Sequence, residues 1–93
     1  MERPDEDLDI VRRRLAWRAS RRGIKEMDLL VGGFAEQRLA GMTAAELEAF
    51  SAILDLPDQD LLSWATGQQP VPADIDSALL RAVLAFRPAV LKA

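Results

Sequence analysis

One periodic segment of the sequence reads Ile24-Lys25-Glu26-Met27-Asp28-Leu29-Leu30-Val31-Gly32-Gly33-Phe34-Ala35-Glu36-Gln37-Arg38-Leu39. Its apolar residues recur mainly at intervals of three and four, as they do on the buried side of an amphipathic helix. The residues on this apolar arc are Ile24, Met27, Leu30, Val31, Phe34 and Ala35. The pattern predicts a helix over residues 24–39, which Gly41 would end.

The sequence before this segment predicts another helix. Leu8, Val11 and Leu15 lie at helical spacing and indicate a helix over about residues 6–20. Gly23 follows, and we expect it to end this helix in the left-handed conformation that glycine adopts readily.

Three more helices are predicted toward the C-terminus. Thr43-Ala44-Ala45-Glu46 has the pattern of a capping box, which begins a helix that runs to about Leu54. A short helix should begin at Asp58 and end before Gly67. The last helix should begin near Ala73 or Asp74, because apolar residues recur from there at helical spacing.

Joined by short links, the five helices predict a compact all-α five-helix bundle that forms a single domain over residues 1–93. The helical core would span residues 8–87, between a flexible acidic N-terminus at about residues 1–7 and a tail at residues 88–93. No segment of useful length alternates polar and apolar residues as a strand does.

The composition excludes most catalytic chemistry. The 93 residues include no Cys and no His, which removes disulfides, thiolate metal sites, Cys nucleophiles and His bases. The longest near-apolar run, Leu29 to Ala35, is far shorter than the roughly 20 residues that span a bilayer. We therefore expect no catalytic residue, no metal site and no membrane insertion. We also expect no stably bound cofactor and a protein that is monomeric when free.

The charge is unevenly distributed along the chain. Seven bases and no acid lie between Arg12 and Lys25, so this stripe carries +7 while the rest of the chain carries −10. The stripe indicates either an anionic partner or a solvated helix face. Trp17 lies within it, nearly opposite the apolar side of its helix, and is either covered by a second helix or exposed as a contact residue. Burial is the commoner fate of tryptophan, so we expect Trp17 to be covered.

Glu26, Leu29 and Gly33 lie on the face of the helix over residues 24–39 that points away from its apolar arc. Gly32 and Gly33 each lower helix stability by about 1 kcal/mol relative to Ala. Either a partner surface approaches closely over this face, or the helix bends or ends at the glycine pair.

Arg21-Arg22-Gly23-Ile24-Lys25-Glu26 connects the first two predicted helices. One interpretation is structural: a helix ends here, and a first-turn acid complements the dipole of the next helix. The other interpretation is functional, since the corner combines a guanidinium, a carboxylate and an accessible backbone, which suit docking to a charged crevice.

Two motifs resemble a known family. Arg22-Gly23-Ile24-Lys25-Glu26 matches the RGxxE signature of the succinate dehydrogenase assembly factors, which are small flavinylation factors. Asp58-Gln59-Asp60-Leu61-Leu62-Ser63-Trp64 resembles their D-x-D-L-x-x-W segment, in which we expect Leu61 and Trp64 to be core residues. The resemblance covers roughly residues 8–87 and is that of a small bacterial member, because no transit signal is evident.

This resemblance implies an assembly factor of the bacterial cytoplasm, not an enzyme. Such proteins bind the flavoprotein subunit of succinate dehydrogenase, and in some bacteria of fumarate reductase, and promote covalent attachment of FAD to a His of that subunit. The FAD therefore acts on the partner flavoprotein. The resemblance assigns the partner contact to Arg22, Gly23 and Glu26. Other positions of the junction and its flanking faces extend the candidate partner-binding set to Arg18, Arg21, Lys25, Asp28, Leu29 and Gly33.

The alternative is a nucleic-acid-binding or antitoxin-type regulatory helical module that uses the basic stripe from Arg12 to Lys25. The helix over residues 24–39 carries only Lys25 and Arg38 as bases, which is unlike the recognition helix of a helix-turn-helix. The acidic remainder of the chain would also repel phosphate. We therefore expect no nucleic-acid partner.

Overall fold

A computed structural model describes residues 7–87 of the chain. The expected flexible N-terminus, apart from Asp7, and the tail at residues 88–93 lie outside the described residues. Within residues 7–87 the chain forms five α-helices and one short 3-10 helix, with no strand. The predicted all-α, single-domain bundle is thus confirmed.

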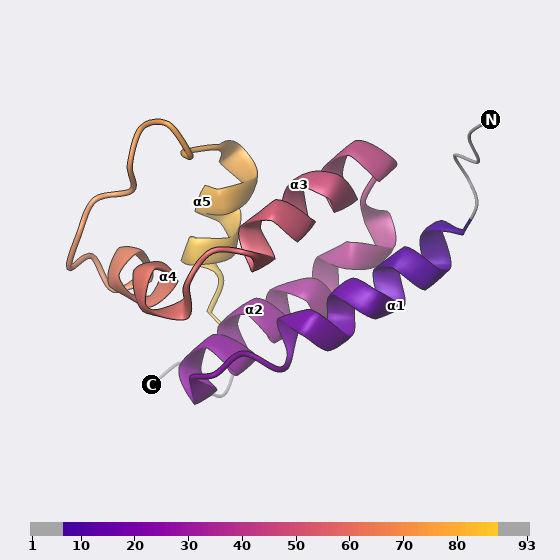
Figure 1. The fold of residues 1–93 in the computed structure, drawn as a ribbon, viewed down its shortest axis with the longest axis horizontal. Helices are drawn as coiled ribbons and strands as arrows, with labels where there is room; N and C mark the ends of the chain where they lie inside the picture. The colour runs from indigo at the N-terminus through magenta and orange to yellow at the C-terminus, as the bar shows by residue number, and fades with distance from the viewer. Residues whose placement is uncertain (1–6, 88–93) are drawn as a thin grey trace.

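The first two helices form a long antiparallel pair (Figure 1). Helix α1 spans Leu8–Ala19 and α2 spans Lys25–Arg38, close to the predicted bounds. Helix α2 continues through both glycines and ends five residues after Gly33. The 3-10 helix η1, Leu39–Gly41, follows it directly.

The third and fourth helices begin where the sequence predicts. Helix α3 spans Ala44–Leu54, and its capping box is complete. The backbone N–H of Glu46 donates to the Thr43 hydroxyl at 3.1 Å, and the Glu46 carboxylate accepts from the Thr43 N–H at 2.9 Å. Helix α4 spans Asp58–Ala65. Gly67 follows it with a φ of 80°, the left-handed conformation expected at a helix end.

The predicted start of the last helix is wrong. Helix α5 spans Ala78–Ala85, several residues later than the expected start. Residues 73–75 form a turn instead, and the N–H of Ile75 donates to the carbonyl of Pro72. Ser77 caps the helix, because its hydroxyl accepts from the N–H of Leu80 at 3.0 Å. Ile75 therefore has the spacing expected of a helix but lies in a turn, from which it packs against the core.

All five α-helices contribute buried side chains to one core. The rings of Phe34 and Phe50 lie 5.8 Å apart, and Phe86 meets Phe34 edge-on at 6.0 Å. Burial of each large side chain contributes about 1.5–3 kcal/mol to stability. Leu61 is fully buried, whereas Trp64 is half-buried and packs against the core from its edge.

Gly23 does not end α1 in a left-handed conformation, contrary to prediction. Gly67 is the only glycine of residues 7–87 with a positive φ. Helix α1 ends at Ala19, four residues before Gly23. Ser20 follows as the capping residue, and its N–H and hydroxyl both donate to the carbonyl of Ala16. The cap is therefore complete before the chain reaches Gly23.

Gly32 is explained by packing within the chain. A Cβ at this position would lie 3.2 Å from the Cα of Ser20, which is closer than side chains normally approach backbone. Glycine at position 32 therefore allows α2 to pass close to the end of α1. The alternative that the helix ends at Gly32 and Gly33 is wrong.

The expectation that a second helix covers Trp17 is also wrong. Its side chain is 58% exposed. Helix α1 packs against α2 and α3 with its other sides, on which Leu15 and Ala19 are buried. Trp17 points outward, and the guanidinium of Arg21 stacks on its ring at 4.7 Å.

Candidate functional site

The junction between α1 and α2 is a short extended turn. Ile24 precedes α2 in an extended conformation, and its carbonyl accepts from the N–H groups of Met27 and Asp28 at 2.9 and 3.0 Å. The first turn of α2 therefore forms directly after Gly23. This places the RGxxE signature across the corner, with Arg22 and Gly23 in the turn and Glu26 in the helix.

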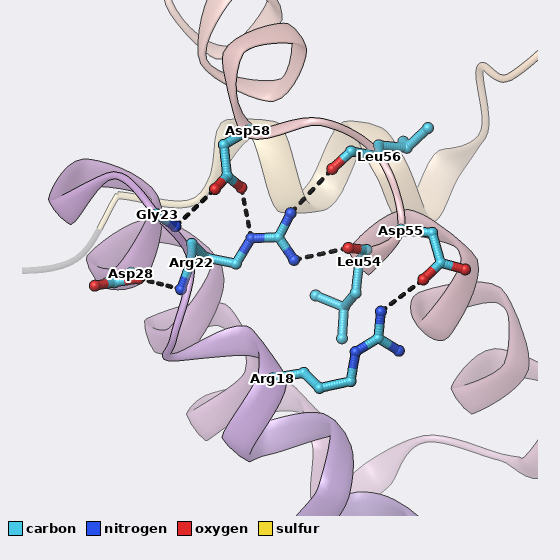
Figure 2. Close-up of polar contacts among 8 residues, drawn as sticks. All are labelled: Arg18, Arg22, Gly23, Asp28, Leu54, Asp55, Leu56 and Asp58. Atoms are coloured by element: carbon cyan, nitrogen blue, oxygen red, sulfur yellow. Dashed lines mark hydrogen bonds and ion pairs between the residues drawn. The ribbon is translucent and has the colours of Figure 1, made fainter.

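The side chain of Arg22 points into the molecule (Figure 2). It is only 9% exposed. Its Nε donates to Asp58 Oδ1 at 2.6 Å, and its two terminal nitrogens donate to the carbonyls of Leu54 and Leu56 at 2.8 and 3.0 Å. All three guanidinium nitrogens are therefore engaged between the end of α3 and the start of α4.

Asp58 holds two parts of the corner together. Its Oδ1 accepts from Arg22, and its Oδ2 accepts from the backbone N–H of Gly23 at 2.8 Å. Asp58 is the first residue of α4 and also the first residue of the D-x-D-L-x-x-W segment. The two motifs quoted for the family resemblance thus meet in one hydrogen-bonded contact, which Figure 2 displays.

Two other residues of the predicted set also have internal partners. The carboxylate of Asp28 accepts from the backbone N–H of Arg22, which ties the turn to the first turn of α2. Arg18 donates to Asp55 at 2.6 Å and to the hydroxyl of Ser51 at 3.3 Å. The side chains of three of the nine predicted site residues, Arg18, Arg22 and Asp28, therefore form contacts that hold the corner in place.

The other six predicted residues lie at the surface. Arg21, Gly23, Lys25 and Glu26 are exposed, and Leu29 and Gly33 are half-buried. The side chains of Lys25 and Glu26 form no hydrogen bond or ion pair with any residue of 7–87. Glu26, Leu29 and Gly33 follow one another along one face of α2. These three residues of α2 thus form one continuous surface.

A hollow of about 150 Å³ lies beside Glu26. Met27 and Leu30 of α2 line one side, and Leu62 of α4 lines the other. Arg87 also borders this hollow, and its guanidinium donates to the carbonyl of Ala65 at 3.0 Å. Sequence reasoning missed this hollow, because the residues that form it come from three separate parts of the chain.

Sequence reasoning also missed the role of Asp58. The D-x-D pattern that begins at Asp58 draws attention to this residue. The residues near Asp58 in the sequence do not predict its contact with Arg22. Within residues 7–87 no cluster of three or more carboxylates is placed to hold a metal ion. Among the described residues, the corner therefore offers a docking surface with one carboxylate and one ammonium that have no partner within residues 7–87, and an exposed glycine.

Comparison with known proteins gives one family. Residues 13–87 match the family described as flavinator of succinate dehydrogenase. The matched range includes both the RGxxE signature and the segment from Asp58 to Trp64.

Named relatives agree with this match. The chain is 42% identical over 77 residues to the FAD assembly factor SdhE of Acetobacter pasteurianus, covering 83% of this chain and 71% of that protein. It is 41% identical over 66 residues to the mitochondrial succinate dehydrogenase assembly factor 2 of Debaryomyces hansenii, covering 71% and 46%. The corresponding protein of Aedes aegypti is 31% identical over 81 residues, covering 85% and 50%. The chain thus spans half or less of these two mitochondrial relatives.

No helix within residues 7–87 is both long enough and apolar enough to cross a membrane.

Proposed function

Since the chain belongs to the family of succinate dehydrogenase flavinators, we propose that it binds the flavoprotein subunit of succinate dehydrogenase and promotes covalent attachment of FAD to that subunit. The family is one of assembly factors, so the prediction that the chain is not an enzyme is confirmed at this level. The flavoprotein of fumarate reductase, which presents the same cofactor, is the second target that we propose.

The observation that carries the proposal is the exposed corner formed by Gly23, Lys25 and Glu26. Asp58 ties this corner to the start of α4, because its carboxylate accepts from both the Gly23 N–H and Arg22. A preorganised surface binds with a smaller entropic cost than a flexible one. The carboxylate of Glu26 and the ammonium of Lys25 are then available for groups of the partner.

The geometry assigns different roles to the three residues of the signature. Glu26 and Gly23 lie at the surface and would contact the flavoprotein. Arg22 is a positioning residue, because its guanidinium has three internal partners. This differs from the direct docking role that the sequence suggested for Arg22.

The proposed mechanism is positional. FAD, held by the flavoprotein, supplies the reactive ring, and this chain would stabilise the arrangement in which that ring meets its target side chain. Ordering two reactants in this way replaces a large part of the entropic barrier. The described chain needs no bound FAD for this role, and we propose that it acts as a monomer in the bacterial cytoplasm, which the bacterial relative supports.

The structure weakens the alternative of a nucleic-acid-binding module, which depends on the bases of the stripe being available to phosphate. Of the seven bases in the stripe, Arg12, Arg18 and Arg22 donate hydrogen bonds to residues that are distant in the sequence. Arg12, for example, donates to the carbonyls of Leu39 and Met42 at 3.0 and 2.9 Å. These three guanidinium groups are therefore committed to the fold and are poorly placed to bind phosphate.

Complex formation tests the proposal. The purified chain would be mixed with the FAD-loaded flavoprotein subunit and analysed by size-exclusion chromatography and isothermal titration calorimetry. We expect a one-to-one complex with the wild-type chain and a weaker complex with Glu26→Ala. Failure of the wild-type chain to bind either flavoprotein would contradict the proposed function.

A further inference from the structure

The outward side of α1 carries the two large apolar side chains that are exposed within residues 7–87. Trp17 is 58% exposed and Ile10 is 45% exposed. They lie seven residues apart, so they share one face of the helix two turns from each other. Exposed tryptophan has an unfavourable contact with water and is enriched at protein interfaces. The fold itself makes no use of this indole in its core.

Trp17 is held in place by a cation. The guanidinium of Arg21 lies 4.7 Å from the centre of its ring, within the range of a cation–π interaction. Arg21 also donates to the hydroxyl of Ser20 at 3.2 Å, which fixes the arginine side chain against the end of α1. The stack therefore presents a flat apolar surface with a positive charge on it.

Further positive charge surrounds this stack. Arg13 and Arg14 are exposed on the same helix, and neither forms an ion pair with a described residue. No acid lies between Arg12 and Lys25 in the sequence. We call the group formed by Ile10, Arg13, Arg14, Trp17 and Arg21 the Trp17 surface.

We propose that the Trp17 surface is a second docking surface, which binds an acidic patch on the flavoprotein with an apolar recess for the indole. The inference rests on the proposed function and extends it beyond the Gly23–Glu26 corner. Charge complementarity supports it, because carboxylates around a recess would pair with Arg13, Arg14 and Arg21. Tryptophan and arginine are also the residues that contribute most often to binding energy at protein interfaces.

The position of the surface suits one partner that spans both sites. Arg21 precedes Gly23 by two residues and lies in the link between the end of α1 and the corner. We therefore expect a partner that docks at Gly23 and Glu26 also to reach the Trp17–Arg21 stack. Two linked contacts raise the affinity above that of either alone.

An acidic protein fits this surface better than a lipid bilayer does. Interfacial helices insert a broad apolar face into the membrane, whereas this face has only Ile10 and Trp17. Nucleic acid fits less well because the whole chain carries a net charge of −3.

The test measures the affinity of the wild-type chain and of Trp17→Ala for the FAD-loaded flavoprotein by isothermal titration calorimetry. We expect Trp17→Ala to weaken binding by about tenfold or more. Its melting temperature should stay near that of the wild type, since the side chain is exposed. Gln69→Ala, in the exposed loop between α4 and α5, is the matched control and should bind normally.

The charges are tested separately with Arg13→Ala/Arg14→Ala. This double variant should bind more weakly than the wild type, and its affinity should fall less steeply with added NaCl. Vesicles of phosphatidylglycerol and phosphatidylcholine, and a 20-base-pair DNA duplex, serve as the other probes. Binding of either probe that depends on Trp17 would overturn the assignment of an acidic protein partner.

The outcomes separate the two proposals. If the wild-type chain binds the flavoprotein and Trp17→Ala binds equally well, the Trp17 surface is not a docking surface and the proposed function stands. If the wild-type chain does not bind at all, the proposed function fails and this inference fails with it.

Discussion

Arg22 and Asp58 are 36 residues apart in the sequence, and the Nε of Arg22 donates to Oδ1 of Asp58 at 2.6 Å. The contact is largely shielded from water, with 9% and 19% of the two side chains exposed. It joins the turn after α1 to the first residue of α4. The arginine of the RGxxE signature therefore supports the shape of the corner, while Gly23 and Glu26 form its surface.

Asp58→Ala should destabilise the fold by about 2–3 kcal/mol, because it leaves the shielded guanidinium of Arg22 without its counter-ion. Asp60→Ala is the matched control. Asp60 also lies in the first turn of α4 but is exposed, so its loss should cost less than about 1 kcal/mol. Urea unfolding measures both. Equal stability of the two variants would show that the contact with Arg22 contributes little.

Arg22→Lys should reduce stability and flavin attachment together. Lysine keeps the charge but lacks the planar fork that reaches Asp58 and two carbonyls at once. Trimethylamine N-oxide favours the folded state, so it should restore flavin attachment to Arg22→Lys but not to Glu26→Ala. Attachment that stays low in fully refolded Arg22→Lys would instead indicate a direct contact between Arg22 and the partner.

Gly32→Leu should destabilise the chain by about 1–3 kcal/mol, because a side chain there would press on the backbone of Ser20. Gly41→Ala is its control. Position 41 has a negative φ and nothing within 4 Å of an added Cβ, so this substitution should be tolerated. Thermal unfolding followed by circular dichroism gives both values. A Gly32→Leu variant as stable as the wild type would mean that α1 and α2 can separate at this point without cost.

Gly23 should tolerate substitution in the fold but not in the complex. An added Cβ would meet only Asp58 Oδ2, at an ordinary distance of 3.6 Å, and the backbone φ is not positive. We therefore expect Gly23→Ala and Gly23→Leu to fold, with the leucine variant binding the flavoprotein more weakly than the alanine variant. Calorimetry with both variants measures this, and equal affinities would indicate that no partner surface approaches Gly23 closely.

Much of the fold follows from local pattern. The capping box at Thr43 and Glu46 and the apolar arc of α2 depend on residues within a few positions of one another, so the sequence predicts them correctly. The start of α5 was missed because Ile75 has helical spacing but belongs to a turn, and the helix begins only after the cap at Ser77. Local spacing does not distinguish these cases.

The candidate site was predicted only in part, for a different reason. The positions of Gly23 and Glu26 at the surface follow from a corner between two helices. The burial of Arg22 depends on Asp58 and on the carbonyls of Leu54 and Leu56, which only the packed bundle brings near. The exposure of Trp17 likewise depends on which sides of α1 the other helices cover, and that information is not local to α1.

The most direct measurement of the central claim is covalent flavin in the flavoprotein, read by in-gel fluorescence after co-expression in a host that lacks its own assembly factor. Wild type would be compared with Glu26→Ala and with Thr43→Ala, which loses a helix cap worth about 1 kcal/mol far from the corner in sequence. We predict strong fluorescence with the wild type and Thr43→Ala, and at least a severalfold loss with Glu26→Ala. Fluorescence that does not depend on the chain, or that Glu26→Ala supports as well as the wild type does, would contradict the assignment of flavin attachment to this corner.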